Sequence, residues 1–330
     1  MNYEIVRYSD EWESKWDRFV FNKAANGTFL QTRKFLNYHP KNRFKDASLL
    51  IMQGSNIVAV IPACETNEDG RKCFFSHKGS TFGGILPDMN KYKISDLEEM
   101  FPLFENFLLG EGYDFVYIKN TSAVFAKTSP ELLDYYYYKN GYKEIDELNF
   151  YIDCKAIESD ITKSWSAGRR RDYRYSLENN LRFERLTKDS DIADFYRILK
   201  DSLLRHGVEP VHSLAELLDF KNVRLTDIVD FYGVFFNSTL IAGTMLFYFG
   251  KDVLHTQYLA QDVNYSGLFT MNFLNYSLIK LAKDNGFDKL SFGISTENQG
   301  IVLNKGLAVF KEGFGTQFCN NRSYYKDLYS

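Results

Sequence analysis

The stretch that decides the fold begins at His255 with HTQYLA, a short, apolar and β-prone run. A helical pattern follows from about Thr270 to Asn285, and Gly286 stops it. A second β-prone run, DKLSFGI, comes next at 288–294. A strand, a helix and a second strand in this order predict neighbouring strands that run parallel to each other.

A polar corner follows the second of these strands. Residues 295–300 read STENQG, and we predict that they open a last helix that ends near 310–315. Polar side chains therefore gather at the carboxyl ends of two predicted strands, where open α/β sheets hold their ligands. The sequence thus predicts an α/β fold with mixed sheets and a functional site at this edge.

Two segments of the second half of the chain resemble segments of the first half. LLIMQGSNIVA at 49–59 matches YGVFFNSTLIA at 232–242, and GYDFVYI at 112–118 matches GFDKLSF at 286–292. Both pairs occur in the same order, as a hairpin, a helix and a strand that begins with Gly, an aromatic residue and Asp. We interpret the pattern as an internal duplication of one α/β unit.

The duplication predicts two domains, at 1–154 and 155–330. A chain of 330 residues is long enough for two hydrophobic cores. The second copy is the more polar one, because SFGIS at 291–295 stands where the first copy has VYIKN at 116–120. We therefore expect the chemistry in the second domain, at its join with the first.

Composition excludes some classes of function. A net charge of -3 argues against a protein built to hold duplex DNA. The four cysteines show no CxxC spacing, so we expect reduced thiols, no metal site and a cytoplasmic location. No apolar run reaches the roughly 18 residues of a membrane span, so any membrane contact would be peripheral. The 29 Phe and 23 Tyr indicate either bulky cores or aromatic walls around a sugar or lipid-linked substrate.

The duplicated unit resembles the tandem acyltransferase fold of the Fem-like branch of the GNAT superfamily. The resemblance covers nearly the whole chain, and its most specific segments include GSTFGG at 79–84, HTQY at 255–258, FGISTE at 292–297 and FKEGFG at 310–315. It implies two tandem GNAT-like domains and transfer of an acyl or aminoacyl group to an amine. It also implies a role in the assembly of bacterial envelope glycan, capsule or peptidoglycan precursors.

The resemblance implies acyl-CoA, acetyl-CoA above all, as the donor of the acyl group. The superfamily's phosphate loop reads Q/R-x-x-G-x-G/A, whereas this chain has NYSGLF at 264–269, with one Gly and no basic first residue. Backbone N–H groups at the start of the following helix can still hold a phosphate. The predicted donor-binding residues are Tyr265, Ser266, Gly267, Leu268, Phe269, Asn304 and Lys305.

Three residues are candidates for the chemistry of amine acylation. His255 has the pKa range of a general base near neutrality, or it is a histidine satisfied within the sheet. Glu297 is a second base or an ammonium ligand, or it stabilises the first turn of a helix. Tyr258 protonates a leaving thiolate or a sugar oxygen, or it packs in the core. The sequence lacks a Gly-x-Ser-x-Gly elbow, so we expect direct attack of an amine on a thioester or ester.

A further set of polar residues is predicted to bind substrate. Arg170 and Arg174 share one helical face and could hold a phosphate of CoA, tRNA or a lipid-linked precursor, or they form a solvated basic face. Lys305 and Lys311 could neutralise phosphate or oxyanion charge, or they are solvated. The full substrate-binding set is Arg170, Arg174, His206, His212, Gln257 and Lys311.

Three functions follow from these residues and from the resemblance. The first is an acyl-CoA-dependent N-acyltransferase that acts on an amino sugar or another envelope or capsule precursor, soluble or lipid-linked. The second is an aminoacyl-tRNA-dependent transferase of peptidoglycan bridges. The chain lacks the long helical arm that some tRNA-using Fem ligases insert, and this absence weakens the second alternative. The third is a non-catalytic binding module of a glycan-assembly complex, which would keep its function in cells after His255→Ala and Glu297→Ala.

Overall fold

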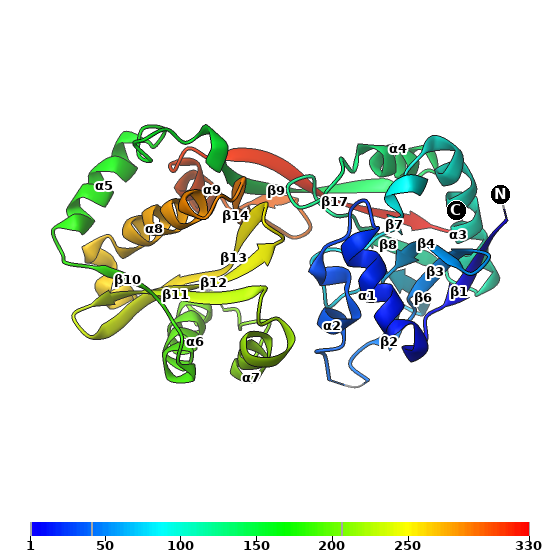
Figure 1. Cartoon of the computed structure of the whole chain (residues 1–330), viewed down its shortest axis with the longest axis horizontal. Coiled ribbons are helices and arrows are strands. Elements are labelled where there is room, and N and C mark those ends of the chain that lie inside the picture. The colour runs from blue at the N-terminus through cyan, green and yellow to red at the C-terminus, as the bar shows by residue number, and fades with distance from the viewer. Residues whose placement is uncertain (1, 41, 206, 330) are drawn as a thin grey trace. The chain divides into compact units, whose positions relative to one another are not determined.

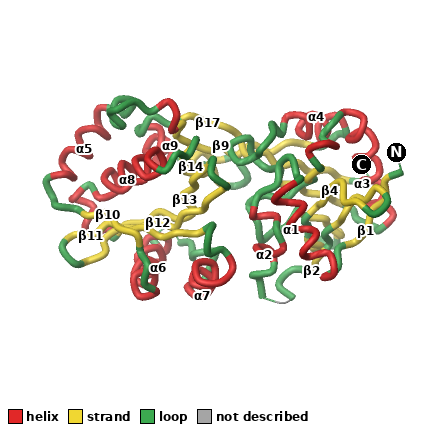
Figure 2. The backbone as a smooth tube through the Cα atoms, viewed as in Figure 1, coloured by secondary structure: helices red, strands yellow, loops and turns green. Residues whose placement is uncertain are grey.

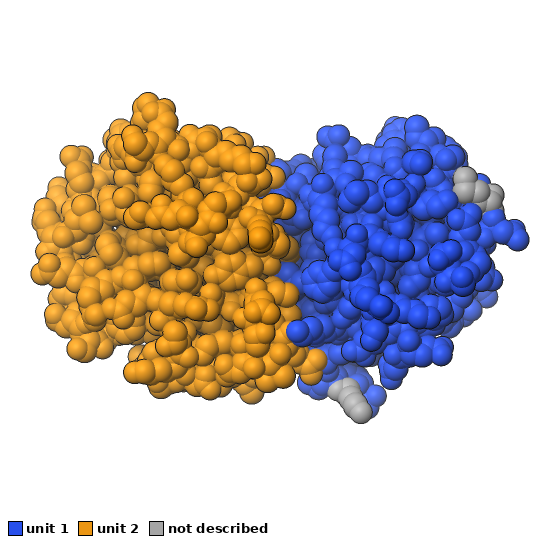
Figure 3. All heavy atoms as spheres, viewed as in Figure 1, with its two compact units in different colours: residues 1–147, 319–330 blue, residues 148–318 orange. Residues whose placement is uncertain are grey.

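The computed structural model describes residues 2–40, 42–205 and 207–329, and it has a mixed α/β architecture (Figure 1). The chain forms two compact units (Figure 3). Unit 1 comprises residues 1–147 and 319–330, and unit 2 comprises residues 148–318. The division expected from the sequence, 1–154 and 155–330, divides the chain at a single point. In the structure the last twelve residues, 319–330, belong to the first unit.

Unit 1 is built from two sheets and the helices that cover them. Its helices are α1 (Glu13–Asn22), α2 (Arg33–Leu36), α3 (Ile94–Gly110) and α4 (Glu131–Lys139). One sheet has the order β1 (Tyr3–Arg7), β3 (Leu49–Gln53), β4 (Asn56–Ile61) and β7 (Leu86–Pro87). The strands of the other sheet that belong to unit 1 follow the order β17 (Gln317–Asp327), β8 (Phe115–Lys119), β6 (Arg71–Phe75), β5 (Cys64–Glu68) and β2 (Lys45–Asp46). In this second sheet β6 and β8 run parallel.

Unit 2 is built around one mixed sheet. Its strands follow the order β10 (Arg182–Arg185), β11 (Val229–Phe236), β12 (Thr239–Phe249), β13 (Val253–Gln261), β14 (Lys289–Ile294) and β9 (Lys143–Asp153). A small separate hairpin joins β15 (Thr296–Glu297) to β16 (Val302–Leu303). The helices are α5 (Ala167–Leu177), α6 (Asp189–Leu204), α7 (Leu214–Asp219), α8 (Thr270–Asp284) and α9 (Lys305–Glu312). In the main sheet β13 and β14 run parallel.

Helices cover both faces of the sheet of unit 2. α5, α8 and α9 lie on one side of the strands, and α6 and α7 lie on the other (Figures 1 and 2). On the α6 side, Gly243 lets strand β12 approach closely, because a Cβ there would lie 2.6 Å from the ring of Phe195. On the other side, Trp165 packs edge-on against Phe314 at a ring distance of 4.9 Å. The many aromatic residues are thus used largely in the cores.

The predicted duplication is present in the order of the elements. Each unit contains an antiparallel hairpin, β3–β4 or β11–β12, and a parallel pair, β6–β8 or β13–β14. The tight turns of the two hairpins need a left-handed residue, which is Gly54 in one and Asn237 in the other. α8 spans Thr270–Asp284 and ends before Gly286, as the sequence predicts.

One local prediction was wrong. The polar corner 295–300 does not open the last helix, because it forms the β15–β16 hairpin, whose turn contains left-handed Asn298, Gln299 and Gly300. The helix starts at Lys305, where the side chain of Asn304 accepts a hydrogen bond from the N–H of Leu307.

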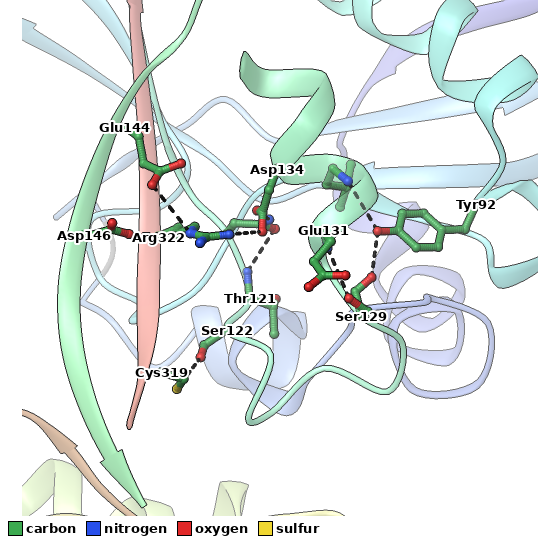
Figure 4. A network of polar contacts seen from close by, with 12 residues as sticks. Tyr92, Thr121, Ser122, Ser129, Glu131, Asp134, Glu144, Asp146, Cys319 and Arg322 are labelled. Atoms are coloured by element: carbon green, nitrogen blue, oxygen red, sulfur yellow. Dashed lines mark hydrogen bonds and ion pairs between the residues drawn. The ribbon is translucent and has the colours of Figure 1, made fainter. Parts of the chain in front are cut away.

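The C-terminal strand completes unit 1. Residues Ser323–Asp327 of β17 pair antiparallel with β8. Arg322 lies among three carboxylates of unit 1 (Figure 4), with its nearest nitrogens 3.0 Å from Asp134 and 3.5 Å from both Glu144 and Asp146. Tyr324 is buried, and its ring stacks on Tyr137 at 4.5 Å. The last strand therefore stabilises unit 1, although it follows the whole of unit 2 in the chain.

Removal of residues 319–330 is expected to destabilise unit 1 selectively. The loss of one buried aromatic side chain alone costs about 3 kcal/mol or more, and β8 would also lose its antiparallel neighbour. Hydrogen exchange should show β8 amides losing protection while those of β12 and β13 keep theirs. Removal of residues 329–330 is the control. Unchanged protection of β8 in the longer truncation would contradict the assignment of β17 to unit 1.

Candidate active site

The parallel pair β13–β14 separates part-way along its length. Its three paired positions are Val253 with Lys289, Leu254 with Leu290, and His255 with Ser291. Beyond the last pair, β13 continues to Gln261 alongside β12, and β14 continues to Ile294 alongside β9. Within the described residues, the facing edges of these two strand ends are therefore not joined by a ladder of backbone hydrogen bonds.

A bulge in β14 accompanies this separation. The register of β14 against β9 shifts between Ser291 and Gly293. Gly293 has a φ of 73°, and a Cβ there would lie 3.4 Å from the His255 ring, so a larger residue would be strained. The hydroxyl of Thr256 donates to the carbonyl of Ser291 at 3.2 Å, directly after the last paired position.

His255 lies at the point where the strands part. Its Nδ1 is 3.1 Å from the hydroxyl oxygen of Ser291, which also accepts a hydrogen bond from the N–H of Gly293 at 3.2 Å. Burial, and to a smaller extent the charge of Lys311, lower the pKa of His255 to about 4, although hydrogen bonds to Ser291 and Gln257 oppose the shift. The imidazole is therefore neutral at pH 7 and is a weak base.

Lys311 reaches the same strand end from α9. Its side chain is 8% exposed, and its Nζ donates to the carbonyls of Gly293 at 3.1 Å and Ile294 at 2.7 Å. The ring of Phe150 lies 5.6 Å from Nζ. Burial lowers the pKa of Lys311 to about 7. Among the candidate residues, Lys311 is thus a buried amine whose charge changes near neutral pH.

Tyr258 belongs to a different polar contact. Its hydroxyl is 2.7 Å from Nδ1 of His212, which lies just before α7. The His212 ring also makes a T-shaped contact with Phe220, with ring centres 5.3 Å apart. Burial raises the pKa of Tyr258 to about 12, so the phenol keeps its proton at neutral pH. The structure thus pairs Tyr258 with His212, and pairs His255 with Ser291.

Glu297 lies on the exposed hairpin that follows β14. Its carboxylate accepts a hydrogen bond from the side chain of Asn304 at 2.9 Å. The backbone N–H of Asn304 in turn donates to the carbonyl of Ser295 at 2.9 Å, and Lys305 begins α9 beside it. The predicted residues Glu297, Asn304 and Lys305 therefore form one group at the carboxyl end of β14.

The predicted donor loop forms a tight turn before α8. Residues Val263–Leu268 form a short 3-10 helix, and Phe269 has a left-handed backbone with a φ of 54°. The Phe269 ring packs against Tyr175 of α5 at 5.4 Å. Through this contact α5, which carries Arg174, lies beside the start of α8. The loop thus has a neighbouring helix with an arginine, although its own first residue is not basic.

The predicted substrate-binding arginines lie on the surface of α5. Arg174 is exposed, and its Nε donates to the carbonyl of Arg170 at 3.4 Å. Arg169 instead stacks on Phe310 of α9, with its guanidinium carbon 4.4 Å from the ring centre. The predicted residue His206 lies outside the described residues.

The matching place in unit 1 is filled by its own chain. The β6–β8 pairing ends at Phe75 and Tyr117. Beyond it, the backbone N–H of Lys119 donates to the Ser76 hydroxyl at 2.6 Å, and its Nζ donates to the carbonyl of Ser80 at 2.9 Å. The N–H of Gly83 donates to the carbonyl of Lys119 at 2.9 Å. The glycine-rich loop 78–84 therefore packs against its own unit.

In the described ranges, no group of three His, Cys, Asp or Glu residues is arranged to hold a metal ion. Among the described helices, none combines the length and the apolar character that crossing a membrane requires.

The sequence matches no family model and no curated protein. Its structure, however, is similar to a tandem GNAT protein from the clavulanic acid biosynthesis pathway, with a TM-score of 0.55 and 9% identity over 99% of each chain. The crystal structure of FemX is similar over 97% of this chain and 96% of that chain, with a TM-score of 0.70 and 11% identity.

This chain has a tandem GNAT fold of the Fem-like type. L-PGS from Bacillus licheniformis shares the fold, with a TM-score of 0.62 and 14% identity over 95% of this chain and 91% of that chain. In this GNAT fold, the separated strands are β13 and β14 of the second unit.

Sequence reasoning missed a polar chain that leads from His255 through Ser291 to Asn149. Ser291 and Asn149 form the polar contacts under His255, and the hydroxyl of Ser291 is 3.4 Å from Asn149 Oδ1. Asn149 precedes His255 by more than a hundred residues, so no local spacing connects them. A sequence signal for the bulge did exist, because Gly293 interrupts an apolar strand pattern.

His255 is expected to make the stability of the protein depend on pH between about 6.5 and about 4. Its pKa is near 4 in the folded chain and about 6.5 when unfolded, so the unfolded chain binds more protons in this window. The free energy of unfolding should therefore fall by about 3 kcal/mol as the pH drops through it. Urea unfolding of wild type and His255→Gln at pH 7 and pH 4 isolates the contribution of His255 to this pH dependence. Equal pH dependence in both proteins would contradict the burial of a neutral ring.

Proposed function

We propose that this protein is an N-acyltransferase that moves an acyl group from acyl-CoA to the amine of an amino sugar or another envelope or capsule precursor. The observation that carries the proposal is the separation of β13 from β14 beyond His255 and Ser291. Free strand edges offer backbone donors and acceptors to an extended, amide-bearing chain such as the pantetheine arm of CoA.

The start of α8 supports the same donor. A helix of this length offers unpaired N–H groups and a partial positive charge at its N-terminus, both of which favour phosphate. Tyr175 of α5 packs on Phe269 at this helix start, so the neighbouring Arg174 can add a charged donor. The phosphates of acyl-CoA would be held by Ser266, Gly267 and the first turn of α8, with Tyr265 and Leu268 shaping the loop.

We assign the acceptor to polar groups on β13 and at the carboxyl end of β14. The exposed carboxylate of Glu297 would attract the ammonium group of an amino sugar. Tyr258 keeps its proton at neutral pH and would donate a hydrogen bond to the acceptor, held in place by His212. Neutral His255, fixed by Ser291, would orient the reacting carbonyl at the point where the strands part.

Calorimetric titration with acetyl-CoA tests the donor. Wild type should bind it saturably, and Arg174→Glu should raise the Kd about tenfold or more, because a charge-assisted phosphate contact contributes about 1.5–3 kcal/mol. Arg182→Glu is the matched control, since Arg182 is an exposed arginine on β10 that pairs with Glu184. No saturable binding of any acyl-CoA by the wild type would reject the proposal.

A second candidate function is transfer from an aminoacyl-tRNA. The basic face of α5 favours it, because Arg171 and Arg174 are exposed and Arg170 is partly exposed. The likeness to FemX in fold is compatible with it.

This second candidate predicts a salt-dependent affinity for tRNA. Binding should weaken steeply between about 50 and 200 mM salt, and it should be lost in the double variant Arg170→Glu with Arg174→Glu. Filter binding with a labelled tRNA measures both effects. Affinity that does not change with salt, or that survives the double variant, would exclude the α5 surface as a tRNA site.

A further inference from the structure

The ammonium group of Lys311 is buried where charge is costly. Its side chain extends from α9 to the separated end of β14, and its hydrogen-bond acceptors are the two neutral carbonyls of Gly293 and Ile294. In the described part of the chain, no carboxylate lies within ion-pair distance of Nζ. A buried cation without a counter-ion readily gives up its proton.

The charged groups on the surrounding elements do not supply a counter-ion for the Lys311 ammonium. His255 on β13 is neutral at pH 7, and Arg169 on α5 is itself a cation that stacks on Phe310. On α9, Glu312 and Lys305 are exposed, and on the hairpin Glu297 bonds to Asn304. Burial is accordingly the cause of the lowered pKa of Lys311, which is about 7.

The number of acceptors matches the neutral form of the amine. A neutral lysine has two N–H bonds and one lone pair, and two carbonyls accept from Nζ at 3.1 and 2.7 Å. Because both N–H bonds are directed to β14, the lone pair of the nitrogen is what remains to interact with a ligand. The same carbonyls fix the position of Nζ beside the strand end where the acyl carbonyl is proposed to lie.

We infer that Lys311 is the group that takes the proton from the attacking amine. This inference rests on the proposed acyl transfer. As the nitrogen of the acceptor bonds to the thioester carbon, Nζ of Lys311 accepts one proton from that nitrogen. The C–S bond then breaks, and the leaving thiolate takes the proton back from the Lys311 ammonium. The products are an amide and free CoA thiol, and Lys311 returns to its neutral form.

Two measurements test this role. NMR of the side-chain amine of Lys311 should show a titration midpoint near neutrality, far below the ordinary lysine pKa of about 10.4. Rates of CoA release from acetyl-CoA, with a panel of amino sugars as acceptors, should rise through the same midpoint. Lys311→Arg keeps a cation and its donors but cannot give up a proton. It should lower kcat about 100-fold or more and leave the KM for acetyl-CoA near that of wild type.

The controls separate a proton acceptor from a fixed charge. Lys280→Arg, at an exposed lysine of α8 that pairs with Asp284, should leave the rate and its pH profile unchanged. If Lys311→Arg keeps kcat and the pH profile, the positive charge suffices and the inference is wrong. A Lys311 midpoint above about 9 would also overturn it. An inactive wild type whose Lys311 still titrates near neutrality would instead reject the acyl-CoA proposal and leave Lys311 as a proton acceptor of another reaction.

Discussion

The end of parallel pairing between β13 and β14 is the constraint on which the second unit depends. A parallel strand that continued in register would use its backbone groups within the sheet and leave none for a ligand. Here the ladder stops at His255 and Ser291, and each strand then follows its other neighbour. The bulge at Gly293 and the hydroxyl of Ser291 hold this geometry locally, so a small number of residues decides where the sheet opens.

The first unit shows what happens when the same opening is filled. Ser76, Ser80 and Gly83 bond to Lys119 at the end of β8, and the backbone groups there are satisfied within the unit. Both units thus share the arrangement of strands, and they differ in the loop that follows the first strand of the parallel pair. In the first copy the strand end is therefore closed by the unit's own chain.

Burial, rather than contact with opposite charges, determines the electrostatics of the candidate site. It lowers the pKa of both His255 and Lys311 and raises that of Tyr258. Each shift favours the neutral form of the side chain. His255 and Tyr258 are therefore neutral at pH 7, and the protonation of Lys311 is the variable that changes near that pH.

Local patterns in the sequence determined much of the fold. Hydrophobic periodicity and glycine placement predicted α8 and the strands around it, and the repeated hairpin predicted two similar units. The hairpin at 295–303 was missed because its turn depends on left-handed Asn298 and Gln299, which a helix-start pattern resembles. The tertiary structure alone decided that Tyr258 pairs with His212, that Lys311 is buried against Gly293 and Ile294, and that β17 returns to the first unit. The physical reason is that burial, and hence pKa, depends on neighbours far apart in the chain, which no local spacing encodes.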